Sequence, residues 1–411
     1  MGAVLDLVLG CSQHGGPART AGHDRKGADV IVVGGGVTGL STAWWLARAG
    51  VDVMVIEKGI VGWGASGRNG GGATHHQSPL FAEEQRLWPL MDELLGYPTE
   101  YQPKRIRIAL SDAQMEEFRI GVANTRGQGF PAEWLDASQV RALVPLAGDN
   151  VRGGVYYERG GHANPQRTVQ AYAWALQDLG GRILQHTAVT GFERRGDRIV
   201  AVETSAGSFS CNTLVLAAGP QTGILTALLD SEVPVTPARA EMIVTEPLPL
   251  MPLGGVDGNH LYGRQTLRGN LAYGGGPHEW LRPQDDGVAA RPSSPPARHV
   301  AKRLAELLPQ ASHIRLIRRR GGGLENPPDG RPVIDRLPTA GNVIAATMSS
   351  VGFGLSPATG RAICQLVLDG RCDFADLSSF RLSRFGNLSP DWREERGWLP
   401  PQTDGDDARA A

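Results

Sequence analysis

Three glycines near the start of the 411-residue chain have the spacing of a phosphate-binding turn. Gly34, Gly36 and Gly39 form the pattern G-x-G-x-x-G directly after a run of β-branched residues and at the opening of a helical pattern. The first glycine permits a tight turn, the second lets the backbone approach a pyrophosphate, and the third lets helix and strand pack closely. The helix N-terminus adds unpaired N–H groups and a positive partial charge. The pattern predicts a bound dinucleotide but does not separate NAD from FAD.

An acidic residue and a glycine-rich loop follow this turn. Glu57 lies 18 residues after Gly39, at the end of a second predicted strand, where a carboxylate can accept hydrogen bonds from ribose hydroxyl groups and repels a 2′-phosphate. The polar loop 60–72 can wrap a ligand that extends past the pyrophosphate, which favours FAD. The other cofactor-binding residues expected in this region are Val37, Thr38 and Lys58.

The elements that would position these residues alternate along the chain. The predicted strands are 29–33, 51–56, 181–186, 213–217 and 343–347, with a hairpin over 189–202. The predicted helices are 39–50, 168–179, 297–308 and 357–368. Strand–helix–strand patterns at both ends, with β-rich material between them, predict an α/β fold with an inserted second domain.

Six motifs in the same order resemble the FAD-dependent D-amino-acid oxidase superfamily, over roughly residues 28–386. They are the glycine pattern with Glu57, and segments 64–70, 161–165, 214–220, 328–332 and 352–354. The chain is most similar to the branch of glycine oxidase, sarcosine oxidase and the β-subunits of D-hydroxyproline or opine dehydrogenases. This resemblance implies a Rossmann-type, glutathione-reductase-like FAD-binding domain and an interleaved α+β substrate domain on a mostly antiparallel sheet.

The resemblance also implies a discontinuous division of the chain. The FAD-binding domain is expected at 28–80, 150–225 and 330–386, and the substrate-binding domain at 81–149 and 226–329. A flexible lead-in, 1–27, and a tail, 387–411, would flank them.

By position, the resemblance implies a cradle around a non-covalently bound FAD. The expected contacts are Ser66, Arg68, Asn69 and Gly70 under the flavin and ribityl chain, with Ala65 and Gly71 in the same loop; Val189 at the adenine; Ala218 and Gly219 beside the pyrophosphate; and Gly352, Phe353, Gly354 and Leu355 at the pyrimidine end of the flavin. None of the four cysteines lies where covalent attachment can be assigned, and they form no metal-ligand pattern, so no metal site is expected.

Enzymes of this family oxidise a C–N bond by hydride transfer to flavin N5, and the resulting imine hydrolyses. An amino-acid substrate needs a cation for its carboxylate, preferably a bidentate arginine. Arg264 is the first candidate, with Tyr262 as a polar neighbour, and Arg320 is the second. The alternative for each arginine is a solvated position on a strand.

Two further features bear on the substrate side. His75 and His76 follow the glycine-rich loop, where related sarcosine oxidases place basic residues beside the flavin; either histidine, His76 first, could face the flavin, and the alternative is a hydrogen-bonded structural role. Glycine oxidase-like members carry an arginine soon after the glycine turn 321–323, whereas this chain has Glu325 and Asn326. Glu325 is therefore a candidate for contact with a cationic group of a larger substrate.

The leading hypothesis is an FAD-dependent oxidase or dehydrogenase of a small amino or imino acid. The alternatives are an oxidase of another amine, such as a γ-glutamyl polyamine, a non-catalytic FAD-binding subunit of a larger complex, and an NAD-dependent dehydrogenase. A net charge of −1 gives no support for nucleic-acid binding, and no apolar run is long enough to span a membrane. We expect a soluble cytoplasmic protein, either a homo-oligomer or a subunit with a redox partner. The substrate and the electron acceptor stay open.

Overall fold

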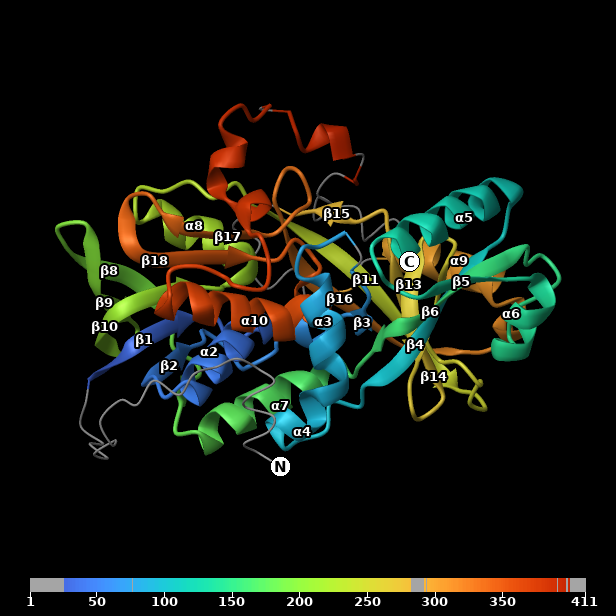
Figure 1. Ribbon diagram of the computed structural model, residues 1–411, viewed down its shortest axis with the longest axis horizontal. Helices are drawn as coiled ribbons and strands as arrows, with labels where there is room; N and C mark the ends of the chain where they lie inside the picture. Colours follow the sequence, from blue (N-terminus) through green and yellow to red (C-terminus); the bar gives the residue numbers. More distant parts are fainter. Residues whose placement is uncertain are drawn as a thin grey trace.

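Two large β-sheets and the helices that cover them form the molecule (Figure 1). The computed structural model describes residues 26–75, 77–281, 292, 294–389, 391–396 and 398–399. Helices α2, α7 and α10 lie against the first sheet, and α5, α6 and α9 lie around the second (Figure 1). The mixed α/β fold predicted from the sequence is therefore confirmed.

The first sheet carries the glycine-rich turn. Its strand order is β17–β18–β10–β1–β2–β7, and the hairpin β8–β9 pairs with β10. The neighbours from β18 to β7 are parallel, whereas β17 and the hairpin are antiparallel. The strands are β1 (Gly27–Val33), β2 (Val53–Ile56), β7 (Arg182–Leu184), β8 (Val189–Arg195), β9 (Arg198–Thr204), β10 (Gly207–Leu216), β17 (Val333–Leu337) and β18 (Ala340–Thr347).

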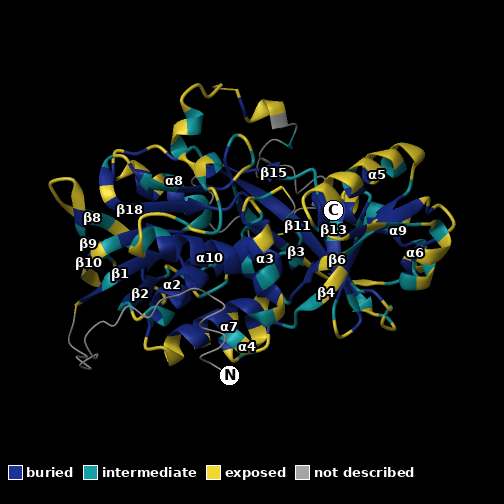
Figure 2. Ribbon diagram, viewed as in Figure 1, coloured by how far each residue is buried: buried dark blue, intermediate teal, exposed yellow. Residues whose placement is uncertain are grey.

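Both faces of the first sheet are buried, which explains why its central strands are nearly continuous runs of apolar residues. Along β1, Val30 and Val32 point into a core shared with α2, α7 and α10, whereas Ile31 and Val33 point into a second core on the opposite face. Figure 2 shows this buried centre in dark blue. The covering helices are α2 (Val37–Arg48), α7 (Pro165–Asp178), α8 (Thr222–Ala227) and α10 (Gly352–Leu368).

The second sheet is mostly antiparallel, as expected. Its order is β15–β11–β14–β13–β12–β4–β6–β3, with β16 on β11 and β5 on β6, and only the β12–β4 pair is parallel among the described strands. Its strands are β3 (Gly72–Ala73), β4 (Gln102–Ala109), β5 (Ala132–Leu135), β6 (Gly153–His162), β11 (Thr236–Pro247), β12 (Val256–Gly258), β13 (Leu261–Gln265), β14 (Asn270–Gly275), β15 (Glu279–Trp280) and β16 (Leu316–Asn326).

The remaining elements are short or lie at the edges. The other helices are α3 (Phe81–Leu87), α4 (Met91–Leu95), α5 (Asp112–Gly127), α6 (Ala137–Leu143) and α9 (Ser294–Leu307). The described 3-10 turns are η1 (Ala65–Gly67), η2 (Trp88–Leu90), η3 (Gly219–Gln221), η5 (Pro309–Ala311), η6 (Ser378–Phe380), η7 (Leu382–Phe385) and η8 (Glu394–Arg396). None of the described helices has both the length and the apolar composition that crossing a bilayer requires.

Two predictions need adjustment. Helix α10 begins at Gly352, not at Pro357, so residues 352–355 form its first turn and do not precede the helix. Proline is typical of the first helical position, which is why the sequence favours a start at residue 357. Strands β3 and β6 pair with the second sheet, although both lie in segments assigned above to the FAD-binding domain. The division into domains otherwise stays a prediction.

Gly121 tests whether residues 112–127 form a helix with open space beside this position. It lies within that helix, where an added Cβ would meet no atom within 4 Å. We expect Gly121→Ala to raise the free energy of unfolding by about 0.5–1 kcal/mol, because alanine loses less backbone entropy in a helix. Urea-induced unfolding of both proteins measures the difference. Unchanged or lower stability would contradict this account of α5.

Candidate active site

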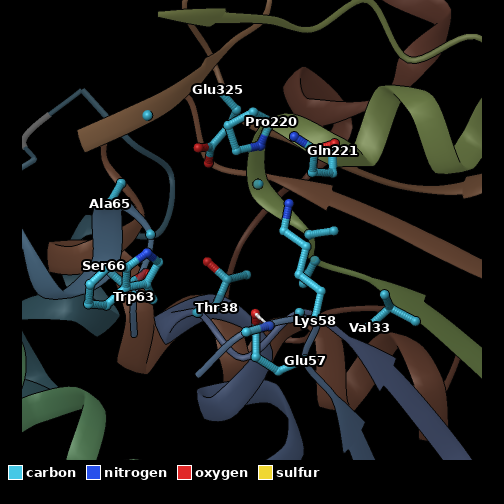
Figure 3. Close-up of a pocket in the computed structure, with 18 of the residues that line it drawn as sticks. Val33, Thr38, Glu57, Lys58, Trp63, Ala65, Ser66, Pro220, Gln221 and Glu325 are labelled. Carbon is cyan, nitrogen blue, oxygen red and sulfur yellow. Dashed lines mark hydrogen bonds between the residues drawn. The ribbon is translucent and has the colours of Figure 1, made fainter. Parts of the chain in front are cut away.

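A cavity of about 410 Å³ lies between the C-terminal edge of the first sheet and strand β16 of the second (Figure 3). Most of the residues predicted to bind the cofactor line it. These residues are Gly34, Gly36, Thr38, Glu57, Lys58, Ala65, Ser66, Arg68, Val189, Ala218 and Gly219. The cavity is also lined by residues that were not predicted, which come from separate segments of the chain, among them Thr187, Pro220, Gln221, Ile224, Pro237 and Ala346.

The glycine turn is shaped for a ligand that carries phosphate. A Cβ on Gly34, whose φ is +113°, would clash with the carbonyl group of Ala217, and a Cβ on Gly39 would clash with the carbonyl oxygen of Gly34. Helix α2 begins at this turn with no side-chain cap of its own and no acidic residue in its first turn. Ser66 Oγ, from the glycine-rich loop, accepts the Val37 N–H at 2.9 Å. The remaining N–H groups and the helix dipole suit a pyrophosphate.

Glu57 is held rigidly at one end of the cavity. Its Oε2 accepts the Gly35 N–H and its Oε1 accepts the Gly59 N–H, each at 2.7 Å. A carboxylate oxygen can accept more than one hydrogen bond, so both oxygens keep capacity for the hydroxyl groups of a ribose. The structure therefore places a carboxylate beside the glycine turn, and its contact with a ribose stays a prediction.

Replacing Glu57 with Gln tests this end of the site. The amide keeps one oxygen but presents an NH₂ group to one of the two backbone N–H donors. Because hydrogen bonds to charged groups contribute about 1.5–3 kcal/mol, we expect the Kd for FAD to rise about 10- to 100-fold. Fluorescence titration of the apoprotein with FAD measures it, and Glu193→Gln on the exposed hairpin β8–β9 is the control. Equal affinities for the two variants would contradict the assignment.

Arg68 ties the glycine-rich loop to strand β16 of the second sheet. Its Nε donates to the Trp63 carbonyl at 2.7 Å, its Nη1 donates to the Gly321 carbonyl of β16 at 3.2 Å, and its guanidinium lies 4.3 Å from the centre of the Trp63 ring. Burial lowers the pKa of Arg68. Asn69 instead shapes the loop, since its side chain bonds the carbonyls of Ala65 and Ser66 and the N–H of Gly71.

The other predicted cofactor contacts lie outside the lining of this cavity. They are Val37, Gly39, Asn69, Gly70, Gly71, Gly352, Phe353, Gly354 and Leu355. The start of α10 nevertheless adjoins the cavity, because a Cβ on Gly352 would lie 3.4 Å from Thr38 Oγ1. Helix α10 also lacks a side-chain cap and an acidic first turn. Its role at the flavin stays a prediction.

The three residues predicted for the substrate share one face of the second sheet. Tyr262 pairs with Gly274, Gly274 with Met242, and Met242 with Arg320 across β13, β14, β11 and β16. Directly opposed residues share a face, and Arg264 lies two residues after Tyr262 on the same side of β13. The glycine-rich loop covers this face, since a Cβ on Gly70 would lie 3.1 Å from the Tyr262 ring.

Arg264 is a buried cation, not the solvated strand arginine of the alternative reading. Only 7% of it is exposed, and its Nη1 donates to the Gly70 carbonyl. Burial lowers its pKa to about 10, with the positive charges of Arg320 and Arg105 adding to the shift and Glu100 opposing it. The guanidinium is thus protonated at neutral pH. Arg320 is a second cation nearby, whereas Arg105 is paired with Asp257.

Tyr262 and Arg320 are both half-buried, and burial shifts the pKa of each. Burial raises the pKa of the half-buried Tyr262 to about 12, so its hydroxyl stays a neutral donor. Arg320 is also half-buried; burial lowers its pKa, and the charges of Arg318 and Arg68 act in the same direction.

His75 is fixed by a carboxylate that the sequence analysis missed. Its Nδ1 lies 2.8 Å from Oε1 of the fully buried Glu84, and its backbone N–H donates to Glu84 Oε2 at 3.3 Å. The ring packs against Gly354 in the first turn of α10. This is a hydrogen-bonded histidine at the junction of loop and helix. His76 lies outside the described residues.

An ion pair near Arg264 was not predicted from the sequence. Arg105 is buried on β4, and two of its nitrogens contact the carboxylate of Asp257 on β12. Asp257 Oδ1 also accepts the Gly263 N–H at 3.2 Å. The two partners are 152 residues apart in the chain, so no local pattern pairs them. The described residues hold no cluster of side chains that could bind a metal ion.

Comparisons with known proteins agree with this geometry. The model of the family described as FAD dependent oxidoreductase matches residues 29–366. Sarcosine oxidase subunit beta from Rhizobium meliloti (strain 1021) is 30% identical over 386 residues, which cover 90% of this chain and 89% of that protein. Gamma-glutamylputrescine oxidoreductase from Escherichia coli (strain K12) is 30% identical over 290 residues, or 63% of this chain and 66% of that protein.

Glycine oxidase from Geobacillus kaustophilus (strain HTA426) is 27% identical over 378 residues, which cover 87% of this chain and 97% of that protein. A solved structure of glycine oxidase from Geobacillus kaustophilus superposes with a TM-score of 0.80 at 24% identity, covering 87% of this chain and 98% of that chain. The fold is therefore shared along nearly the whole length of that enzyme.

Proposed function

The chain belongs to the FAD-dependent oxidoreductase family, and on that premise we propose that it oxidises the C–N bond of a small amino or imino acid. The chain is a flavoprotein of an enzyme family that acts on amine donors. FAD, when bound, supplies the group that accepts hydride from the substrate carbon. The protein's own residues must then hold the substrate in the position and orientation that hydride transfer requires, and exclude water.

The observation that carries the proposal is the buried charge of Arg264. A buried cation is costly unless an anion pairs with it, and no ion pair to Arg264 is found among the described residues. The guanidinium has further N–H donors beyond the one bonded to Gly70, and these can hold a carboxylate in bidentate geometry. Tyr262 lies on the same face and can donate its hydroxyl to the same anion.

The second candidate is an oxidase of a γ-glutamyl polyamine, favoured by the similarity to gamma-glutamylputrescine oxidoreductase. Such a substrate also carries a carboxylate, so Arg264 would serve either enzyme.

A non-catalytic FAD-binding subunit is the third candidate. The similarity to a protein named as a β-subunit supports a partner subunit, and the intact flavin loop supports catalysis. Homo-oligomer formation and a cytoplasmic location stay predictions.

Anaerobic mixing of the purified yellow holoprotein with a panel of amines tests the proposal. The panel contains glycine, sarcosine, the proline enantiomers, other D-amino acids and γ-glutamylputrescine. Loss of flavin absorbance with a small amino or imino acid supports the proposal. Loss with γ-glutamylputrescine alone favours the second candidate, and no loss with any compound overturns both. Readmitting oxygen then separates an oxidase, which recovers its colour rapidly, from a dehydrogenase.

A further inference from the structure

A second carboxyl group faces the cofactor cavity, on the opposite side from Glu57. Glu325 lies near the end of β16 and lines the cavity. Its Oε1 accepts the Met348 N–H at 2.9 Å, and its Oε2 lies 3.9 Å from the position of a Cβ on Gly219. In Figure 3 the carboxyl group of Glu325 points toward the middle of the cavity, and Thr38 lies between it and Glu57. The side chain thus belongs to the cofactor cavity, whereas the sequence analysis considered it for a cationic substrate.

The surroundings of Glu325 leave its carboxyl group in need of donors. Burial raises its pKa, against the opposing effect of the Met348 N–H. No ion pair to Glu325 is found among the described residues. Arg68, a cation of the same cavity, is bonded to the carbonyls of Trp63 and Gly321. Lys58 extends from the opposite wall toward the segment that holds Pro220 (Figure 3).

The chemistry of FAD supplies suitable donors on this side. Glu57 lies at the ribose end, and the glycine turn at α2 is suited to the pyrophosphate. In FAD the group that follows the pyrophosphate is the ribityl chain, which carries hydroxyl groups. A second carboxylate facing the pyrophosphate itself would be repelled, whereas a hydroxyl donor satisfies a half-buried carboxylate.

We propose that Glu325 is a cofactor-binding residue that accepts a hydrogen bond from a ribityl hydroxyl group of FAD. Two carboxylates, Glu57 and Glu325, would then recognise hydroxyl groups on the two sides of the pyrophosphate. The proposal rests on FAD binding in this cavity and is independent of which amine the protein oxidises. Glu325 would then recognise the flavin half of the dinucleotide, and Glu57 the adenosine half.

The test combines a substitution with altered cofactors. Wild-type and Glu325→Gln apoproteins are titrated with FAD and with FAD analogues that lack the 2′, 3′ or 4′ ribityl hydroxyl, and quenching of flavin fluorescence gives each Kd. In the variant we expect the amide oxygen to accept the Met348 N–H, as Oε1 does in the wild type. The amide NH₂ group, a donor, then takes the place of the acceptor Oε2. We expect about a 10-fold loss of FAD affinity in the variant. We expect a similar loss for one deoxy analogue in the wild type, and no further loss for that analogue in the variant.

Two results would overturn the proposal. The first is that every deoxy analogue binds the wild-type apoprotein as tightly as FAD, a result that does not depend on how well the variant folds. The second is that the loss of affinity from the analogue and the loss from the substitution multiply. Such a result would mean that the two groups act independently, whereas groups in direct contact are coupled. Glu193→Gln, on the exposed hairpin, is the control. None of these titrations involves an amine, so failure here and failure of the proposed amine oxidation are distinguishable.

Discussion

Replacement of Arg264 with Gln is expected to weaken the binding of an amino-acid substrate by at least about 30-fold. Removing one partner of a buried, hydrogen-bonded charge pair costs about 2–5 kcal/mol, and 1.4 kcal/mol corresponds to a factor of ten. Arg264 meets the condition because it is buried, stays protonated at neutral pH, and shares its sheet face with Tyr262. The measurement is an anaerobic titration of flavin reduction with the amino acid that reduces the wild-type protein.

The matched control for Arg264→Gln is Arg318→Gln. Arg318 lies in the same row across the second sheet as Arg264, through Ala272 and Val244, but it is exposed. We expect this control to change the apparent substrate affinity little, since exposed charges are screened by water and salt. An Arg264→Gln variant that binds its substrate as the control does would show that the carboxylate lies elsewhere. The FAD content of both variants is measured as well, because Arg264 also bonds the Gly70 carbonyl of the glycine-rich loop.

Replacement of Asp257 with Asn is expected to lower the free energy of unfolding by about 3–5 kcal/mol. The change removes the charge that pairs with Arg105, whose side chain is only 5% exposed, and leaves that cation uncompensated beside Arg264. The acceptor of the Gly263 N–H is also perturbed. Urea-induced unfolding of the holoprotein, monitored by tryptophan fluorescence and by release of flavin, measures the effect.

A double variant separates the loss of an ion pair from general damage to this region. With Arg105→Leu and Asp257→Leu together, no uncompensated charge remains, and such replacements of buried pairs are often near neutral. We therefore expect the double variant to be more stable than Asp257→Asn alone. A double variant at least as unstable as the single one would mean that packing, and not charge, determines stability here.

The cofactor-binding half of the site could be predicted from the sequence because its contacts are local. Gly34, Gly36, Gly39 and Glu57 lie within one strand–helix–strand unit, so a fixed spacing implies a fixed geometry. The start of α10 was misplaced for an equally local reason, because Pro357 resembles a first helical residue. Its missing N–H removes only one bond, to the first turn of a helix that is otherwise buried against α2.

The substrate half could be predicted only in part. The roles of Arg264 and Tyr262 stay predictions, and the face that they share with Arg320 depends on the register of four strands, from residue 236 to residue 326. Glu84 and Asp257 became visible only in the folded protein, since their partners His75 and Arg105 are chosen by tertiary packing. Glu325 illustrates the same limit: the sequence marks it as unusual, and only the fold places it in the cofactor cavity.

Flavin reduction by matched pairs of amines tests most directly whether this flavoprotein oxidises amines that it holds by a carboxylate. The pairs are glycine and methylamine, sarcosine and dimethylamine, and proline and pyrrolidine, each mixed anaerobically with wild-type holoprotein at equal concentration. We expect the carboxylate member of at least one pair to bleach the flavin, and its partner to leave the spectrum unchanged. Equal bleaching by both members of each reactive pair, or none by any carboxylate member, would contradict this account.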